Sequence, residues 1–401
     1  MTGCIVTLVI VLKAGAERLR IPALVSYILL GFALRVLDAR YNVCSEHAME
    51  IFEFLAKFGV ITLLFRIGLE SNIRGLLQQL RHASFIWVVN VAASLGLSYG
   101  VASVWLGLEA IPSLFIAIAL TATSVGISVG VWHAADALES SNGELLVDVA
   151  ELDDISSIIF MALLFAVVPI LREGTQDQAL FLVLLKSGGM ILLKLLGFGL
   201  FCVVFSLYVE EHVTRFIQKI QSSPEPMLMV VSLGIIMGAF AGLIGFSVAI
   251  GAFFAGLVFS RDPEAVHFDA SFSALYELFS PFFFIGIGLK IDPGALSGGM
   301  KLGAILLLVA VVSKIAGVGA PALVTTEWQG ALLLGVSMIP RAEIAMIVMQ
   351  RGVDLGAWAV PPQVYAAAVL VAAATCLFSP LLIRSLLQRW PQTVQNGEEA
   401  S

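Results

Sequence analysis

Apolar stretches of roughly 18 to 25 residues repeat from one end of this chain to the other, with short polar connections between them. Each stretch is long enough to cross a hydrocarbon core of about 30 Å as a helix. Only 13% of the residues are charged and 59% are hydrophobic, whereas soluble domains average about 25% charged residues. The sequence therefore predicts an all-α polytopic membrane protein.

The spans follow from dividing the sequence at charged residues and at clusters of Pro and Gly. This division predicts about 13 transmembrane helices, with boundaries good to a few residues. The predicted spans are residues 2–18, 21–38, 51–71, 83–106, 111–132, 144–171, 179–208, 225–243, 246–260, 271–289, 299–323, 329–351 and 360–386. The membrane domain thus covers residues 1–386, and residues 387–401 form a short polar tail.

Charge also limits the class of partner and predicts an orientation. A net charge of −7 leaves no basic stripe for nucleic acid. Lys and Arg are more frequent after odd-numbered spans than after even-numbered spans, so the odd side should be cytoplasmic. The N-terminus then lies outside, the C-terminus lies in the cytoplasm, and the span 144–171 enters the membrane from the cytoplasm.

Two adjacent carboxylates, Asp153 and Asp154, lie in the sixth span, in sequence that becomes continuously apolar after them. Ionisable residues at membrane depth are costly, so they are functional-site candidates. The eleventh span contains Lys314, too far from either end to reach water easily. Adjacent side chains on a helix point about 100° apart. We therefore expect one aspartate to pair with Lys314 and the other to face a water-filled cavity.

A carboxylate that faces such a cavity beside a second carboxylate should bind protons more tightly than usual. It can then exchange a proton for a monovalent cation, with oxygen ligands from Thr123, Ser124 and freed backbone carbonyls. Competition of two ions for one site is the minimal chemistry of an antiporter.

Further acidic residues precede the pair: Asp136, Glu139, Glu144, Asp148 and Glu151. They predict a cytoplasmic funnel that concentrates cations, with Asp148 and Glu151 nearest the pair. The alternative is that the first three solvate a loop.

Two spans are predicted to be broken near their centres. Residues 121–128 are rich in β-branched, hydroxyl and Gly residues, and residues 337–343 contain Pro340 between polar and charged residues. Breaks in corresponding spans of two halves are typical of inverted-repeat transporters, whose ion site lies where the broken helices meet. Arg341 and Glu343 should compensate each other or the dipole ends at the break. The alternative is a Pro kink and a small-residue packing face.

Seven segments in order carry a resemblance to the membrane domain of the cation/proton antiporters, in the branch of NapA-like sodium/proton antiporters and Kef potassium efflux systems. They are residues 21–27, 64–70, 121–128, 152–155, 247–256, 283–292 and 340–343. The resemblance implies a homodimer in the cell (inner) membrane and an elevator mechanism. It also implies a core built mainly from residues 83–171 and 271–386, and a dimerisation part built mainly from residues 1–71 and 179–260.

By position, the resemblance implies that Asp154 carries Na⁺ or a proton and that Asp153 pairs with Lys314. Kef-like members usually have Gln at the first aspartate, and electroneutral exchangers usually have Asn. Asp153 therefore favours electrogenic exchange of Na⁺ or Li⁺ for protons, with a role in pH homeostasis. The chain departs from the family pattern at Arg66, Glu151 and Ala342. It lacks the nucleotide-binding tail of Kef proteins, and no cofactor is implied.

Three alternatives stay open. The same fold could exchange K⁺ or several monovalent cations for protons, because selectivity depends on fine cavity geometry. An intramembrane Mg²⁺-dependent enzyme would need a second acidic cluster at matching depth, and only Glu343 is available. A channel would not couple cation movement to bound protons. The favoured class is a transporter and not an enzyme.

Overall fold

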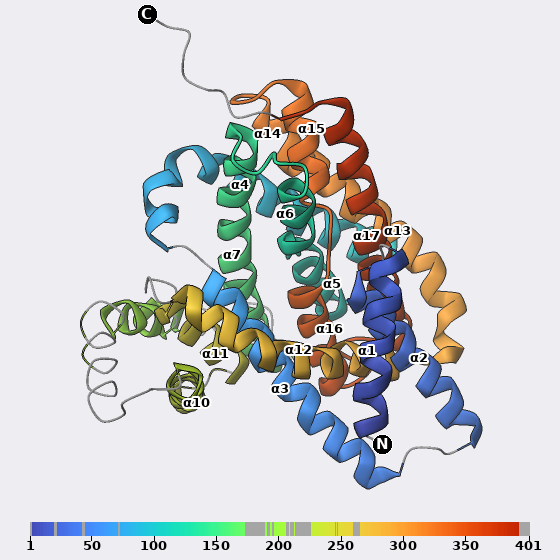
Figure 1. The fold of residues 1–401 in the computed structure, drawn as a ribbon. Coiled ribbons are helices and arrows are strands. Elements are labelled where there is room, and N and C mark those ends of the chain that lie inside the picture. Colours follow the sequence, from blue (N-terminus) through green and yellow to red (C-terminus); the bar gives the residue numbers. More distant parts are fainter. Residues whose placement is uncertain are drawn as a thin grey trace, which may run out of the picture. The chain divides into compact units, whose positions relative to one another are not determined.

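The computed structural model describes residues 2–19, 22–41, 45–70, 73–172, 189–190, 193–194, 196–205, 208, 212, 226–244, 246, 248–259 and 265–392. Every regular element in these ranges is a helix (Figure 1), which confirms the predicted all-α class. Half of the predicted span 179–208 and most of the polar tail lie outside the described residues.

The first half of the chain forms seven α-helices and one π-helical segment within the described residues. They are α1 (Thr2–Leu19), α2 (Ala23–Tyr41), α3 (Glu46–Glu70), α4 (Ile73–Gly100), η1 (Val101–Trp105), α5 (Ala110–Thr121), α6 (Val125–His133) and α7 (Ser141–Arg172). The second half contains α10 (Pro226–Ile244), α11 (Val248–Phe259), α12 (Ala265–Leu289), η2 (Pro293–Ala295), α13 (Leu296–Lys314), η3 (Ile315–Gly319), α14 (Ala320–Ala322), α15 (Trp328–Ser337), α16 (Glu343–Leu355) and α17 (Pro362–Arg389).

Most predicted spans coincide with these helices to within a few residues, but α3, α4 and α12 each begin five or more residues before the predicted start. Helix α4 begins at Ile73 instead of residue 83, so Arg74 and Arg81 lie on the helix. Helix α12 begins at Ala265 instead of residue 271. Charged residues therefore did not mark these helix starts. Five helical segments in the described ranges are long and apolar enough to cross a membrane, and the total of about 13 stays a prediction.

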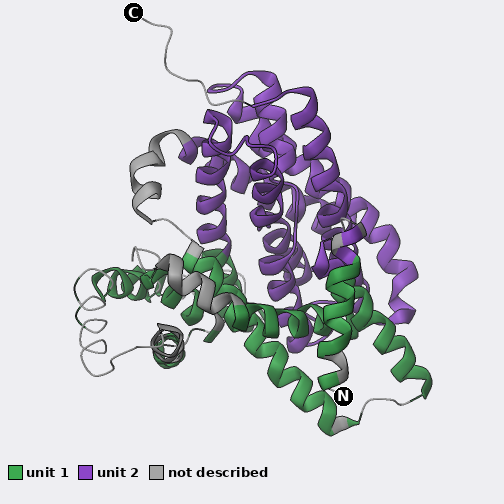
Figure 2. Ribbon diagram, viewed as in Figure 1, with its two compact units in different colours: residues 1–15, 26–73, 158–289 green, residues 16–25, 74–157, 290–401 purple. Residues whose placement is uncertain are grey.

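The chain divides into two compact units (Figure 2). Unit 1 comprises residues 1–15, 26–73 and 158–289, and unit 2 comprises residues 16–25, 74–157 and 290–401. Helix α7 contributes its first half to unit 2 and its second half to unit 1. The predicted core included 271–289, which packs within unit 1. The roles of core and dimerisation part stay a prediction.

In unit 1, helices pack closely where glycines face each other. Gly31 on α2 faces Gly288 on α12, and Gly68 on α3 faces Gly256 on α11, with backbone atoms so near that neither partner has room for a Cβ. Small residues allow such backbone approach between membrane helices. The close packing explains why α12 belongs with α2 and why α11 belongs with α3.

Gly288→Ala should therefore destabilise unit 1. An added Cβ would collide with the backbone of Ile28 and Phe32, and overpacking of this kind typically destabilises by about 1–3 kcal/mol. The measurement is the thermal midpoint in detergent. Gly15→Ala in α1 is the matched control, because nothing lies within 4 Å of its added Cβ. Equal midpoints for both variants would contradict the packing argument.

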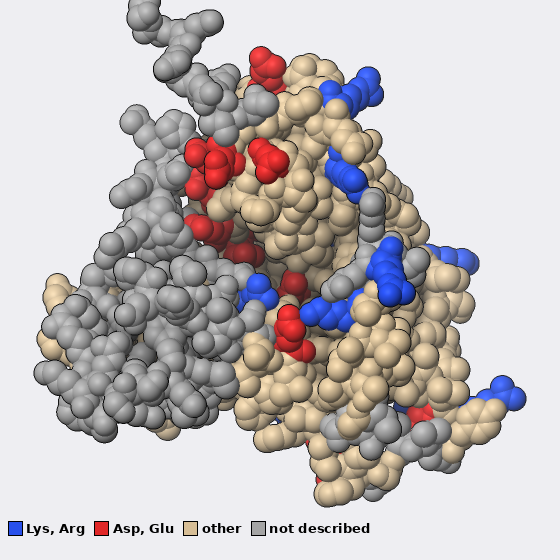
Figure 3. Space-filling view, viewed as in Figure 1, with Lys and Arg blue, Asp and Glu red and all other residues tan. Residues whose placement is uncertain are grey.

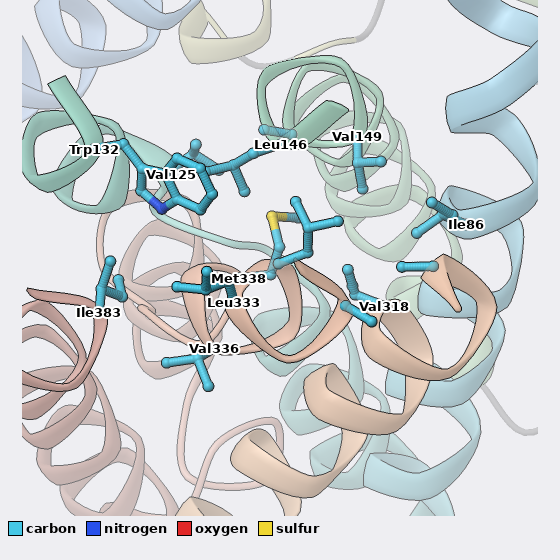
Figure 4. Close-up of a cluster of buried hydrophobic side chains, with 14 of the residues drawn as sticks. Ile86, Val125, Trp132, Leu146, Val149, Val318, Leu333, Val336, Met338 and Ile383 are labelled. Atoms are coloured by element: carbon cyan, nitrogen blue, oxygen red, sulfur yellow. The ribbon is translucent and has the colours of Figure 1, made fainter. Parts of the chain in front are cut away.

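The interior of unit 2 is a cluster of buried apolar side chains from α4, α6, α7, η3, α14, α15 and α17. In Figure 4 Trp132, Leu146 and Val149 face Met338, which lies near the middle of the cluster. Met338 is the first residue after α15. The break in the twelfth span is therefore packed into the apolar interior on one side.

Candidate functional site

Both predicted breaks are present. Helix α5 ends at Thr121 and α6 begins at Val125, whereas α15 ends at Ser337 and α16 begins at Glu343. The two non-helical links meet, because the Ser124 backbone N–H donates to the Pro340 carbonyl at 2.9 Å. Four half-helix ends therefore surround one point in unit 2, two of them carrying the positive dipole end and two the negative.

Arg341 lies at this crossing and is buried. Its Nη1 donates to the carbonyls of Met338 at 3.0 Å and Pro340 at 3.3 Å, and to Thr123 Oγ1 at 3.1 Å. The carbonyl of Met338 is one of those left free where α15 ends, so the guanidinium compensates that negative dipole end. Within the described residues, Nε and Nη2 have no hydrogen-bond partner.

Glu343 is the first residue of α16 and lies at the opposite kind of helix end. The Ser124 hydroxyl, at the residue that precedes α6, donates to Glu343 Oε2. A carboxylate is favourable near helix N-termini, and here it lies beside two of them. Arg341 and Glu343 thus contact different ends of the crossed helices.

A second set of hydrogen bonds ties α6 to α15. The Ser128 hydroxyl donates to the Ser337 carbonyl at 2.6 Å, and Trp132 Nε1 donates to Ser337 Oγ at 2.8 Å. All three side chains are buried. These bonds connect half-helices from the two broken spans and therefore stabilise the crossing.

Asp153 and Lys314 lie together, and both are fully buried. Lys314 Nζ is 3.3 Å from Asp153 Oδ1 and 3.4 Å from Oδ2. Lys314 is the last residue of α13 and is followed by the π-helical segment η3. π-Helical turns often occur at functional sites. Arg341 is near enough to interact electrostatically with both Asp153 and Lys314.

Asn90 is a site residue that the sequence reasoning missed. Its Nδ2 donates to Asp153 Oδ1 at 2.7 Å, and it is fully buried on α4. An isolated Asn within an apolar membrane span was the available signal, because buried polar groups in membranes need partners.

Asp154 is half-buried on α7, about 100° around the helix axis from Asp153. Its charge acts on Lys314. Glu144, Asp148, Glu151 and Asp154 follow one another at intervals of four, three and three residues, so they share one face of the helix. Glu144 is exposed, whereas the other three are partly buried. In Figure 3 acidic side chains gather where Figure 1 shows the first half of α7.

The remaining predicted residues occupy different surroundings. Asp136 and Glu139 are exposed in the connection between α6 and α7. Arg66, one of the departures from the family pattern, lies in unit 1 with its guanidinium 4.5 Å from the centroid of the Tyr276 ring.

Comparison with known proteins decides the family. The sequence profile described as "Sodium/hydrogen exchanger, transmembrane" matches residues 4–389. The chain belongs to this family. It is 28% identical to the high-affinity Na⁺/H⁺ antiporter NhaS3 of Synechocystis, over 91% of this chain and 78% of that protein. It is 29% identical to a Na⁺/H⁺ antiporter of Enterococcus hirae, over 92% of each chain.

The fold has a counterpart among solved structures. The sodium proton antiporter MjNhaP1 from Methanocaldococcus jannaschii superimposes with a TM-score of 0.63 and 18% identity, covering 97% of this chain and 95% of that chain. Other relatives at 24% identity are named as antiporters of sodium and potassium, of ammonium, and of potassium. The chain is therefore a cation/proton antiporter of a membrane, and a transporter rather than an enzyme.

Proposed function

We propose that this antiporter exchanges Na⁺ or Li⁺ for protons and that the exchange is electrogenic. The observation that carries the proposal is the buried pair of Asp153 and Lys314 directly beside the half-buried Asp154. Because Lys314 balances the charge of Asp153, the Asp154 carboxylate contributes the negative charge that attracts a transported cation.

Asp154 alternates between two states in this proposal. On one side of the membrane it releases a proton and binds Na⁺, and on the other side it releases Na⁺ and takes up a proton. Thr123 and Ser124 supply oxygen ligands at the crossing, where the half-helices already present backbone carbonyls. The transported ions are the only bound species that the cycle needs, without a further cofactor.

Lys314 makes the exchange electrogenic in this proposal. When Na⁺ binds, the Asp153–Lys314 pair opens and Lys314 loses a second proton, so two protons leave for each Na⁺. When the site is protonated again, Lys314 regains its proton and pairs with Asp153. One net charge then crosses the membrane in each cycle.

The acidic face of α7 supports a cytoplasmic entry. Asp148 and Glu151 precede Asp154 on the same face, and a row of carboxylates raises the local cation concentration. This direction agrees with the predicted outer N-terminus and cytoplasmic C-terminus in the cell (inner) membrane. An elevator-like movement of the helices around the crossing, within a homodimer, completes the proposal.

Exchange of K⁺, or of several monovalent cations, is the second candidate. Relatives named for potassium and ammonium transport favour it, because they share about as much sequence with this chain as other relatives named for sodium.

Proteoliposomes with an imposed pH gradient test the function and the selectivity. Addition of Na⁺ or Li⁺ should collapse the gradient, and K⁺ should collapse it at least about tenfold more slowly. Equal rates for K⁺ would favour the second candidate. Failure of all three cations to collapse the gradient would overturn antiport. Cation flux that persists without proton movement would instead identify a channel.

A further inference from the structure

Asp153 has two hydrogen-bond partners of different kinds, and the neutral partner is the nearer one. Asn90 Nδ2 lies 2.7 Å from Asp153 Oδ1, whereas Lys314 Nζ lies 3.3 Å from the same oxygen and 3.4 Å from Oδ2. All three side chains have no exposed surface. An ionised carboxylate only accepts hydrogen bonds, so the amide must present its NH₂ group to it.

Asn90 has close neighbours on two sides. Its Oδ1 accepts from the Ser94 hydroxyl at 3.4 Å, one turn along α4. On the other side η3 passes so close that a Cβ at Gly317 would lie 2.9 Å from the Asn90 Cα. A short side chain packed in this way has little freedom. Lys314, by contrast, carries its ammonium on a flexible four-carbon stem.

We propose that Asn90 is the fixed donor that keeps the Asp153 carboxylate hydrogen-bonded and oriented while Lys314 releases it during transport. This inference rests on the proposed electrogenic exchange, in which the pair must open in every cycle. A buried carboxylate that loses its only partner is strongly destabilised. The charge-assisted bond from Asn90 prevents this, so Asn90 is a positioning residue for the transport reaction.

The other charged groups around Asp153 cannot replace this bond. Asp154 on α7 is negative, and Arg341 acts on Asp153 electrostatically from the link between α15 and α16. The Arg341 hydrogen bonds identified in the structure go to that link and to Thr123. Asn90 is thus the neutral donor that stays when Lys314 leaves.

Asn90→Leu removes the donor and keeps the size of the side chain. The maximal rate of Na⁺/H⁺ exchange should fall about tenfold or more, since a hydrogen bond to a charged group is lost. The Na⁺ concentration for half-maximal rate should change less than about threefold, because Asp154 is untouched.

Trp87→Phe is the matched control. It removes the bond from Trp87 to Ser156 between the same two helices, and the exchange rate should stay near that of the unmodified protein.

A double-mutant cycle separates positioning from packing. In an Asp153→Asn background, Asn90→Leu should lower the exchange rate by less than about threefold, because the side chain at position 153 that accepts the Asn90 hydrogen bond is then uncharged. A tenfold loss in that background would overturn the proposal. The same double-mutant cycle can be measured without transport, as the thermal midpoint in detergent. Asn90→Leu should lower the thermal midpoint of the unmodified protein but not that of the Asp153→Asn variant. Equal decreases in the two backgrounds would overturn the proposal. If the unmodified protein exchanges none of Na⁺, Li⁺ and K⁺ for protons, the proposed function fails, and this second cycle still decides whether Asn90 supports Asp153.

Discussion

Asp154→Asn should abolish cation-driven proton movement in proteoliposomes. An amide carries neither the charge that binds Na⁺ nor a site for the exchanged proton, while it preserves the shape of the side chain. We expect the exchange rate to fall by about a hundredfold or more, which corresponds to about 2.7 kcal/mol. The position of Asp154 on the partly buried acidic face of α7, beside the Asp153–Lys314 pair, is the basis for this expectation.

A matched control is Glu277→Gln in unit 1, which also converts a carboxylate to an amide. Glu277 pairs with Lys13 at 3.1 Å and is mostly exposed, so its replacement should leave exchange and stability nearly unchanged. Sodium-driven proton movement that survives Asp154→Asn would remove Asp154 from the role of carrier.

Lys314→Gln should lower stability and make the remaining exchange electroneutral. Loss of one partner leaves the Asp153 carboxylate buried without its cation, and breaking a buried pair in this way typically costs about 3–5 kcal/mol. Gln cannot release a proton, so the second proton of each cycle is lost. The measurements are the thermal midpoint in detergent and the transport current on a supported membrane.

Lys290→Gln is the control for this experiment. Lys290 pairs with Asp354 at 2.5 Å, but both side chains are partly exposed, so the pair should contribute about 1 kcal/mol or less. A sodium-dependent current in Lys314→Gln as large as in the unmodified protein would contradict a role of the Asp153–Lys314 pair in charge coupling.

Local sequence was sufficient for the class of the protein and for the breaks. The all-α class follows from the length of the apolar stretches, since a lipid-spanning stretch of this length has few alternatives to a helix. The breaks at residues 122–124 and 338–342 follow from the same kind of local property, because Pro340 and the hydroxyl- and Gly-rich run at 121–128 disfavour a continuous helix. The family resemblance agrees with the profile match over residues 4–389.

The predicted starts of α4 and α12 were wrong because charged residues do not end a helix by themselves. Arg74 and Arg81 are charged, but Arg is a good helix former, so the helix extends through them. The helix therefore begins before the apolar stretch begins.

Only the tertiary structure decided which groups meet inside the protein. From the residues alone, either aspartate of the pair could have faced Lys314, and the structure places Asp153 there, 161 residues away in sequence. Asn90 carries no local signal of its partner, which is 63 residues distant. Such contacts depend on how α4, α7 and α13 pack together. The sequence by itself determined the helices, their breaks and the presence of costly buried charges, because these are local properties. The choice of partner for each charge is non-local, so it required the fold.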